Sequence, residues 1–347
     1  MLAKRCAGPW QRLDATRTKR EIMQRQLEPT LLGDIGATNA RFCLLANGTL
    51  GPVSNLEVAR YTRFPDAVAD FLKMHRGEMP VSDALLAVSG PVEDGRCKLT
   101  NCPWIIDADE LRSKFRLAQV RVVNDFAATA YSLPSLAAVD LYAIGGGAAV
   151  AGAPVAVLGP GTGLGVAGLV PGANPPIVIA GEGGHATIAG ASDREDAVIA
   201  HLRGRFGHVS AERMISGAGL ENLYRAIAAL ERSEAPLRDA AEITRSALDG
   251  SCRTAVAALH MFCGLLGAFA GDAALMLGAR GGVFIAGGIA PRIVAFMGRS
   301  EFRRRFEDKG RLRPYLEAIP SNVIMHPAAA FVGLKSLAES AANARGR

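Results

Sequence analysis

Several features that would assign a chain to a class at once are missing from these 347 residues. The six cysteines include no Cys-x-x-Cys pair, so a zinc site built from closely spaced thiolates is not expected. No Gly-Lys-Ser or Gly-Lys-Thr follows a glycine-rich turn, which excludes a Walker-type phosphate loop. The N-terminal segment lacks the apolar run of a secretory signal. We therefore expect reduced, mostly buried thiols in a cytoplasmic protein.

Long apolar runs are also scarce. One run, residues 254–277, is long enough to cross a membrane, and His260 and Asp272 interrupt it. No second run accompanies it, and buried helices of large α/β proteins have the same composition. We expect a helix of the protein core or of a dimer interface here, and no membrane partner.

Positive charge is concentrated at one end of the chain. The net charge is +6, and residues 1–28 contain seven Lys and Arg against three Asp and Glu. A basic arm can bind nucleic acid, but this excess lies outside the organised region, so a solvated tail is the simpler interpretation. We predict a basic, disordered N-terminal extension over residues 1–28 and no nucleic-acid partner.

What the sequence does contain is glycine, and residues 30–45 use it in a recognisable way. Apolar residues lead into Asp34, small polar residues follow at Gly36, Thr38 and Asn39, and apolar residues resume at Phe42. This pattern predicts a strand, a tight turn and a strand. Backbone N–H groups of such a turn can surround an anion. An aspartate beside them is useful if Mg²⁺ lies between it and a phosphate, so we expect Asp34 to bind Mg²⁺, through water.

A second hairpin repeats the design at residues 154–170, with Gly161, Thr162 and Gly163 in its turn. A dinucleotide-binding loop would open a helix, whereas an apolar strand follows here. The repetition predicts a duplicated unit with two phosphate-binding turns facing one cleft. No linker rich in Ser, Pro or charge divides the organised region, so the two lobes are expected to share a sheet junction.

Other polar residues fall where α/β proteins place chemistry. Asn124 and Asp125 lie at a predicted strand–helix junction in residues 121–130. Glu182 and His185 lie in a predicted glycine-rich loop over 178–185, and Glu212 lies where residues 208–212 are expected to open a helix. Further helices are predicted at 66–74, within 104–117, at 197–206, 254–277 and 329–339, and strands at 84–90, 281–288 and 323–325. Residues 302–316 are expected to be a charged helix or loop.

Together these segments resemble the superfamily of sugar kinases, actin and heat-shock chaperones, and most closely the bacterial ATP-dependent glucokinases. The matching motifs, in family order, are residues 33–41, 123–126, 159–166, 181–185, 208–213 and 282–289. The resemblance implies an α/β, two-lobed actin-like ATPase (ribonuclease H-like) fold, with duplicated mixed β-sheets flanked by helices and a cleft between the lobes. It implies a small domain over 29–135 plus 326–341 and a large domain over 136–325.

The resemblance also implies a reaction, the transfer of phosphate from ATP to the 6-hydroxyl of glucose, by a homodimer with ATP and Mg²⁺. Asp125 would be the general base, and an ordinary aspartate, ionised at neutral pH, would serve without special tuning. The sugar would be bound by Asn124, Glu182, His185 and Glu212. ATP and its phosphates would be bound by Asp34, Gly36, Thr38, Asn39, Gly161, Thr162, Gly163, Gly287 and Gly288.

Each assignment has a structural alternative. Asp125 could cap the following helix, His185 could serve the fold, and Glu212 could be an acid favoured by the first turn of a helix. Ala37 also departs from the family, where a second glycine is usual, and would be strained at a positive φ. The rival functions are a kinase of another hexose or amino sugar, and a non-catalytic sugar sensor on the same fold.

Overall fold

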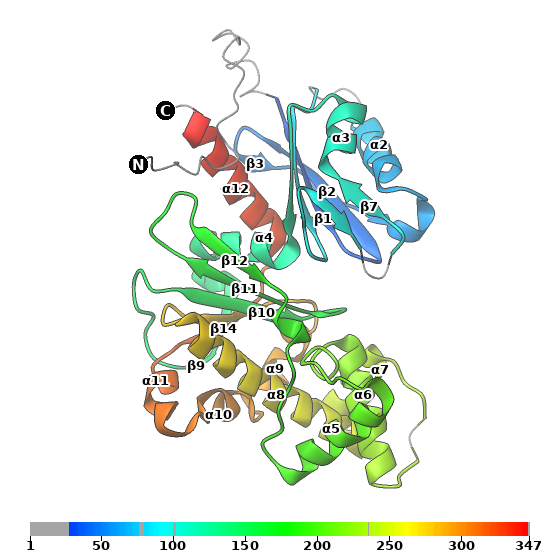
Figure 1. Cartoon of the computed structure of the whole chain (residues 1–347), viewed down its shortest axis with the longest axis vertical. Coiled ribbons are helices and arrows are strands. Elements are labelled where there is room, and N and C mark those ends of the chain that lie inside the picture. The colour runs from blue at the N-terminus through cyan, green and yellow to red at the C-terminus, as the bar shows by residue number, and fades with distance from the viewer. Residues whose placement is uncertain (1–27, 76–79, 100–101, 235, 346–347) are drawn as a thin grey trace, which may run out of the picture.

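The computed structural model describes residues 28–75, 80–99, 102–234 and 236–345. The predicted extension therefore lies, except for Glu28, outside the described residues. Two six-stranded sheets dominate the molecule, one above the other in Figure 1. The described helices are α2 (Phe64–Met74), α3 (Ala108–Phe115), α4 (Asp125–Ser132), α5 (Asp193–Phe206), α6 (Gly217–Leu230), α7 (Ala240–Leu248), α8 (Arg253–Leu277), α9 (Val294–Gly298), α10 (Phe302–Glu307), α11 (Arg313–Glu317) and α12 (Ala329–Arg345).

The first sheet contains both strands of the first predicted hairpin. Its order is β3-β2-β1-β5-β8, and β4 also pairs with β2. The strands are β1 (Thr30–Ile35), β2 (Asn39–Ala46), β3 (Thr49–Leu50), β4 (Ser54–Glu57), β5 (Asp83–Val88) and β8 (Gln119–Asn124). β1 is antiparallel to β2 and parallel to β5, which is parallel to β8. A small hairpin of β6 (Arg96–Lys98) and β7 (Ile105–Asp107) stands beside it.

The second sheet repeats this topology with the second predicted hairpin. Its order is β12-β11-β10-β13-β14-β9. The strands are β9 (Leu141–Gly145), β10 (Val155–Pro160), β11 (Leu164–Val170), β12 (Ile177–Gly181), β13 (Val283–Ile285) and β14 (Ser321–Ile324). β10 is antiparallel to β11 and parallel to β13, which is parallel to β14. The predicted duplication is therefore confirmed, with β10 and β11 in the places of β1 and β2.

Helices α4 and α12 join the two sheets, because each follows a strand of one sheet and packs against the other. α4 follows β8 of the first sheet, yet its Ala130 packs with Val157 and Leu169 of the second. α12 follows β14 of the second sheet, yet its Phe331 packs with Leu32 of the first. The two helices also touch each other closely, since a Cβ on Gly333 would lie 1.7 Å from the carbonyl oxygen of Ala128. The expected sheet junction is therefore wrong: the two sheets are separate, and the packed helices α4 and α12 join them (Figure 1).

The long apolar helix is α8, and most of its residues belong to the largest core. Among the described helices, α8 alone has the length and composition to cross a membrane, and 78% of its most apolar window is buried inside the molecule. Burial on this scale is expected of a core helix, as the sequence suggested. The five described cysteines are free thiols, and Cys43, Cys97 and Cys263 are buried. Cys6 lies outside the described residues.

Two elements differ from prediction. Residues 178–181, the first part of the loop expected over 178–185, belong to strand β12 (Ile177–Gly181), because Ile177, Val178 and Ile179 favour a strand more strongly than the following glycines oppose it. The helix expected to open at residues 208–212 begins only at Gly217, because Ser216 is the capping residue and accepts a hydrogen bond from the Gly219 N–H.

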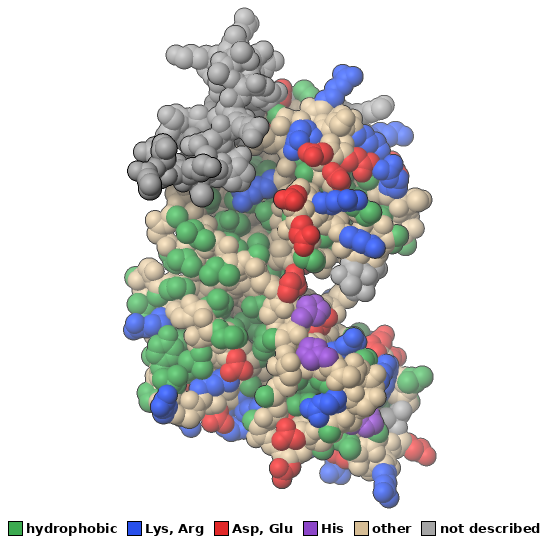
Figure 2. All heavy atoms as spheres, viewed as in Figure 1, with side chains coloured by type: hydrophobic (Ala, Val, Ile, Leu, Met, Phe, Trp, Pro, Cys, Tyr) green, Lys and Arg blue, Asp and Glu red, His purple; other side chains and the backbone are tan. Residues whose placement is uncertain are grey.

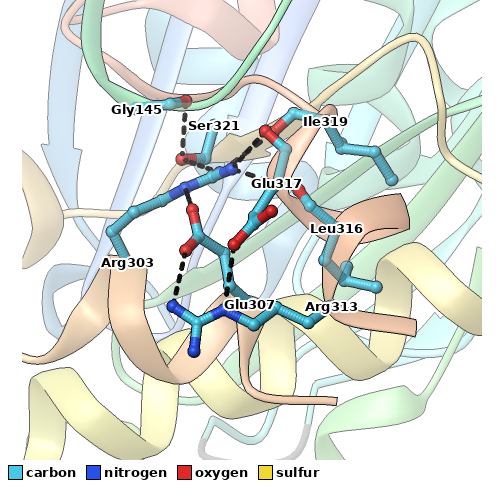
Figure 3. Close-up of polar contacts among 8 residues, drawn as sticks. All are labelled: Gly145, Arg303, Glu307, Arg313, Leu316, Glu317, Ile319 and Ser321. Carbon is cyan, nitrogen blue, oxygen red and sulfur yellow. Dashed lines mark hydrogen bonds and ion pairs between the residues drawn. The ribbon is translucent and has the colours of Figure 1, made fainter. Parts of the chain in front are cut away.

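The charged segment 302–316 forms short helices that one arginine fixes (Figure 3). The Arg303 guanidinium donates to Glu307 at 2.6 Å and to the Ser321 hydroxyl at 3.0 Å. It also donates to the carbonyl oxygens of residues 316, 317 and 319 at 2.9–3.1 Å. Ser321 in turn donates to the Gly145 carbonyl at 3.2 Å. This network ties the segment to the start of β14, the strand that leads to α12.

Candidate active site

The turn between β1 and β2 presents backbone and small polar groups to solvent. The Gly36 N–H donates to the Asn39 carbonyl at 3.0 Å, which closes the turn. Thr38 and Asn39 are exposed, and the Asn39 carboxamide oxygen accepts from Asn55 at 3.2 Å. Ala37 is not among the described non-glycine residues with positive φ. The family glycine can therefore be replaced here without strain in the turn.

Asp34 is paired with an arginine that the sequence motif contained but to which we gave no role. Arg41 lies directly across the hairpin from Asp34, and its guanidinium makes an ion pair with the Asp34 carboxylate. The same guanidinium donates to the Pro327 carbonyl at 3.3 Å and lies 5.8 Å from the centre of the Phe331 ring. Arg41 thus connects the first phosphate turn to the start of α12. The signal was available, since hairpin partners straddling a short turn can be paired from sequence.

The turn between β10 and β11 is built in the same way. The Gly161 N–H donates to the Gly163 carbonyl at 2.8 Å, and Thr162 is exposed. The Gly217 N–H, at the start of α6, donates to the Gly161 carbonyl at 2.9 Å. A Cβ on Gly161 would meet no atom within 4 Å, so its outward side is open. Gly287, with φ 84°, lies directly behind this turn, because its Cβ would lie 2.4 Å from the Pro160 carbonyl oxygen. Gly288 faces open space.

The predicted strand–helix junction is present, and the capping residue is Asn124. Its side-chain oxygen accepts from the N–H groups of Phe126 at 2.9 Å and Ala127 at 3.2 Å, and its amide donates to the Gly90 carbonyl at 3.3 Å. Asp125 is the first residue of α4, where its own carboxylate also accepts from the Phe126 N–H at 2.9 Å. The cap is therefore Asn124 rather than Asp125, and one amide hydrogen of Asn124 remains for a ligand.

Asp125 is not an ordinary aspartate. Burial raises its pKa to about 7, and the neighbouring negative charge of Asp34, with a smaller effect of Glu182, adds to the rise. Hydrogen bonds from backbone N–H groups oppose it. The expectation of an untuned aspartate is wrong, first because Asp125 is buried and then because the carboxylates of Asp34 and Glu182 lie nearby. A carboxylate with a pKa near neutrality is well matched to accepting a proton at physiological pH.

Glu182 and His185 lie on the short turn that follows β12. Both side chains are exposed, and Glu182 makes no capping hydrogen bond. Within the described residues, the His185 ring has no hydrogen-bond partner in the fold. The alternative of a structural histidine is therefore not supported, and both side chains are free to bind a ligand.

Glu212 lies beside the second phosphate turn. Its carboxylate accepts from the Leu164 N–H at 2.9 Å, and its own N–H donates to the Gly184 carbonyl at 2.8 Å. Because α6 begins only at Gly217, the alternative of a first-turn acid is wrong. Backbone pairing of residues 186–188 with 209–211, and a 2.9 Å hydrogen bond between Thr187 and His208, hold the segment of Glu212 against the loop of Glu182.

A hollow separates the part of the molecule that carries β1 and β2 from the part that carries α5 to α7 (Figure 2). Acidic and histidine side chains border it in this view. The buried Cys97 thiol of β6 agrees with this view: burial raises its pKa to about 11, and the negative charges of Asp125 and Glu182 add to the rise. The predicted acids of the first turn, the α4 junction and the β12 turn thus lie close together.

Two duplicated sheets, exchanged helices and a hollow lined by carboxylates define the actin-like ATPase fold of the sugar kinases. A structure of a sugar kinase of the ROK family, the glucokinase from Streptomyces griseus in complex with glucose and AMPPNP, superposes with a TM-score of 0.61 at 20% identity, covering 89% of this chain and 98% of that one. The sequence profile of the glucokinase family matches residues 31–341. The chain belongs to the glucokinase family.

Two closer relatives agree with this membership. The glucokinase of Paramagnetospirillum magneticum is 45% identical over 317 residues, which cover 90% of this chain and 98% of the relative. The crystal structure of a glucokinase from an Antarctic psychrotroph superposes with a TM-score of 0.79 at 36% identity, covering 89% of this chain and 98% of that chain.

Proposed function

We propose that this chain phosphorylates glucose at the 6-hydroxyl with ATP, giving glucose 6-phosphate and ADP. The observation that carries the proposal is Asp125, a carboxylate with a pKa near 7 at a strand–helix junction between two glycine-rich turns. Membership of the glucokinase family supports the substrate, since the curated relatives carry that name. A sugar sensor would have no use for such a base.

In the proposed reaction, Asp125 accepts the proton of the attacking hydroxyl as the oxygen bonds to the γ-phosphorus of ATP. The bond from that phosphorus to the bridging oxygen breaks, and ADP leaves. Phosphoryl transfer needs alignment and charge neutralisation more than covalent work by the protein. The turns at residues 36–39 and 161–163 would align the phosphates through backbone N–H groups, and Gly287 and Gly288 would leave room for the adenosine.

Mg²⁺ fits this site as a partner of ATP. No group of three metal-ligating side chains exists among the described residues, so the protein alone offers no cage. The carboxylates of Asp34, Asp125 and Glu182 nevertheless repel one another, which a cation would relieve. Mg²⁺ commonly takes one or two carboxylates and several phosphate or water oxygens. Asp34 would hold it through water, and the ion would neutralise charge on the phosphates.

Asn124, Glu182, His185 and Glu212 would hold the sugar hydroxyls. Carboxylates accept from hydroxyls, while the remaining amide hydrogen of Asn124 and the imidazole can donate. A site built to hydrogen-bond hydroxyls rejects sugars that lack them, so selectivity over epimers would come from these side chains.

The central test is Asp125→Asn. The amide keeps the shape but cannot accept the proton, so we expect kcat to fall by about 10²–10⁴-fold. The dissociation constant for glucose, measured by calorimetry, should change by less than about threefold, because the amide still hydrogen-bonds the hydroxyl. Because Asn124 already caps α4, the variant should fold. A folded variant with kcat within about threefold of the parent would remove Asp125 from the mechanism.

A substrate panel separates glucose from the rival substrates. Turnover should be measured with ATP and glucose, mannose, fructose and glucosamine at equal concentrations. We expect the highest kcat/KM with glucose. A higher value with another hexose would replace the proposed substrate while leaving the base in place, and no turnover with any would favour the sensor.

We further propose the division into a small domain, 29–135 plus 326–341, and a large domain, 136–325. It is supported by the cores, since one contains only residues 31–122 and the largest only residues 156–323. A homodimer and a cytoplasmic location complete the proposal, and sedimentation of the purified protein tests the former.

A further inference from the structure

Gly163, the last residue of the turn, and Leu164 and Gly165, the first two residues of β11, touch three segments of the proposed site between them. Gly163 faces the Glu212 carboxylate, which a Cβ at position 163 would approach to 2.4 Å. The backbone N–H of Leu164 donates to that same carboxylate, and its carbonyl oxygen would lie 2.0 Å from a Cβ on Gly184. Gly165 faces Phe126. One strand therefore contacts the sugar acid, the sugar loop and the residue that follows the proposed base.

The contact at Gly165 is the tightest of these and involves a ring rather than a flexible tip. A Cβ on Gly165 would lie 1.8 Å from Cδ2, 2.1 Å from Cε2 and 2.5 Å from Cγ of Phe126. Because Cγ lies on the axis of ring rotation, turning the ring about χ2 does not remove the clash with a side chain at 165. The ring must leave its rotamer, or the backbone of Phe126 must shift with it.

Displacing Phe126 moves the proposed base. Its N–H donates both to Asn124, the cap of α4, and to the Asp125 carboxylate, each at 2.9 Å. The second of these bonds holds the Asp125 carboxylate and opposes the rise of its pKa. The ring of Phe126 thus connects the base to β11, the strand that leaves the phosphate turn.

Gly161, four residues earlier, provides the contrast. A Cβ there meets nothing within 4 Å, so contacts within the protein do not require glycine at 161. A ligand that approaches the backbone closely would require it. At 165 the protein does require glycine. The glycines of this motif therefore have two different physical causes.

We infer that Phe126 is a positioning residue whose ring, seated on Gly165, sets the place of the Asp125 carboxylate relative to the phosphate turn 161–163. The inference rests on the proposed role of Asp125 as base. It predicts that Gly165 and Phe126 are coupled energetically, because the damage done by a methyl group at 165 requires the ring at 126.

A double-mutant cycle tests this. Gly165→Ala should lower kcat by at least about 30-fold, since misplacement by about 1 Å can cost 10²-fold. Phe126→Ala alone should lower kcat by about tenfold, and adding Gly165→Ala to it should cost less than about twofold more. Glucose affinity should change by less than about threefold in all three. Gly204→Ala, the same change in open space on α5, is the control and should leave kcat unchanged.

The pH profile of kcat/KM tests the positioning role of Phe126, because a residue that only stabilises the fold would not change the apparent pKa of that profile. Phe126→Ala should shift the apparent pKa of the acidic limb, because the N–H bonds to Asp125 and its burial both change. This measurement also serves if Gly165→Ala does not fold. An unshifted acidic limb in folded Phe126→Ala would overturn the inference.

The cycle has one further decisive outcome. If Gly165→Ala costs as much kcat in the Phe126→Ala background as in the parent, and mainly raises the KM for ATP, the glycine serves the phosphates and the inference is wrong. Asp125→Asn, measured alongside, separates the two proposals. Normal turnover by Asp125→Asn would contradict both the role of Asp125 as base and the inference that rests on it. An inactive Asp125→Asn, together with no energetic coupling between Gly165 and Phe126, would contradict the inference alone.

Discussion

Asp125, the proposed base, is an acid whose surroundings change its affinity for a proton. Burial and the charges of Asp34 and Glu182 raise its pKa to about 7, so the ligand-free protein holds a proton there at slightly acidic pH. A protonated carboxylic acid cannot accept the hydroxyl proton. We therefore expect kcat/KM for glucose to fall tenfold per pH unit below about pH 7, and to level off above it. An acidic limb near pH 4 would contradict this picture.

The same raised pKa predicts a cost in stability. An acid with a pKa of 3.8 in the unfolded chain and about 7 when folded destabilises the folded state as pH rises between these values. Asp125→Asn removes this cost, so it should raise the Tm of the ligand-free protein, and raise it more at pH 8 than at pH 5. The measurement is a pair of thermal melts without sugar or nucleotide. An equal or smaller gain at pH 8 would argue against the shift.

At the residue scale, the sequence indicated which residues to consider for the site better than it indicated their chemical properties, such as the pKa of Asp125. Asp34, Asp125 and Glu182 were each proposed as site residues from local patterns, because a strand end or a glycine turn is readable from neighbouring residues. The raised pKa of Asp125 was not predictable, since it arises first from burial in the fold and then from acids far apart in the chain. Phe126 was missed for a similar reason, because its contact with Gly165 joins two sheets.

At the scale of elements, one buried ion pair holds α10 to α5. Arg305 binds Glu195 through two hydrogen bonds of 2.6 and 3.0 Å, with side chains only 9% and 7% exposed. The pair raises the pKa of the arginine further. Its next neighbour, Arg304, makes an ion pair with Glu301 instead, with both side chains about half exposed.

These two arginines make a matched comparison. Arg305→Met leaves the Glu195 carboxylate buried without its positive partner, with a hydrogen bond from the Ala191 N–H, and breaking a buried pair in this way typically costs about 3–5 kcal/mol of unfolding free energy. Arg304→Met breaks an exposed pair and should cost less than about 1 kcal/mol. Urea denaturation with a constant m value measures both. Equal losses would mean that burial does not control the strength of these pairs.

Elements were predictable where a single pattern acted alone. Both hairpins and α8 follow their apolar spacing closely. The errors fell where two signals competed. β12 has β-branched residues ahead of glycines, and the motif at 208–213 contains a serine, Ser210, ahead of Ser216, which caps α6. The anchoring of residues 302–316 by Arg303 was not predictable, since it depends on carbonyl groups whose directions only the fold determines.

At the scale of the whole molecule, removing the N-terminal segment tests whether that segment contributes to the activity. The family profile begins at residue 31, and the first described residue is 28. We predict that removing residues 1–27 leaves kcat and both KM values within about twofold, which is well under 1 kcal/mol of barrier. Steady-state kinetics of the truncated protein measures this. A tenfold loss in a folded truncation would make the segment part of the enzyme.

The site itself predicts a change of shape. Asn124 ends β8 of the first sheet and Asp125 begins α4, whereas Glu182 and His185 directly follow β12 of the second sheet and Glu212 lies between α5 and α6. A sugar that bonds to both sets gains most when they approach, and approach also excludes the water that would compete for the phosphate. Glucose should therefore reduce the radius of gyration measured by small-angle scattering.

Two comparisons make this closure test decisive. Sorbitol at the same concentration controls for contrast and should leave the radius unchanged. ATP hydrolysis without sugar should be slower than glucose phosphorylation by at least about 10²-fold, because the open site lacks its full alignment. If calorimetry shows glucose bound while the radius stays constant and ATP hydrolysis is equally fast without sugar, the site is already complete in the open molecule. The two sheets would then act as a fixed frame rather than as moving halves.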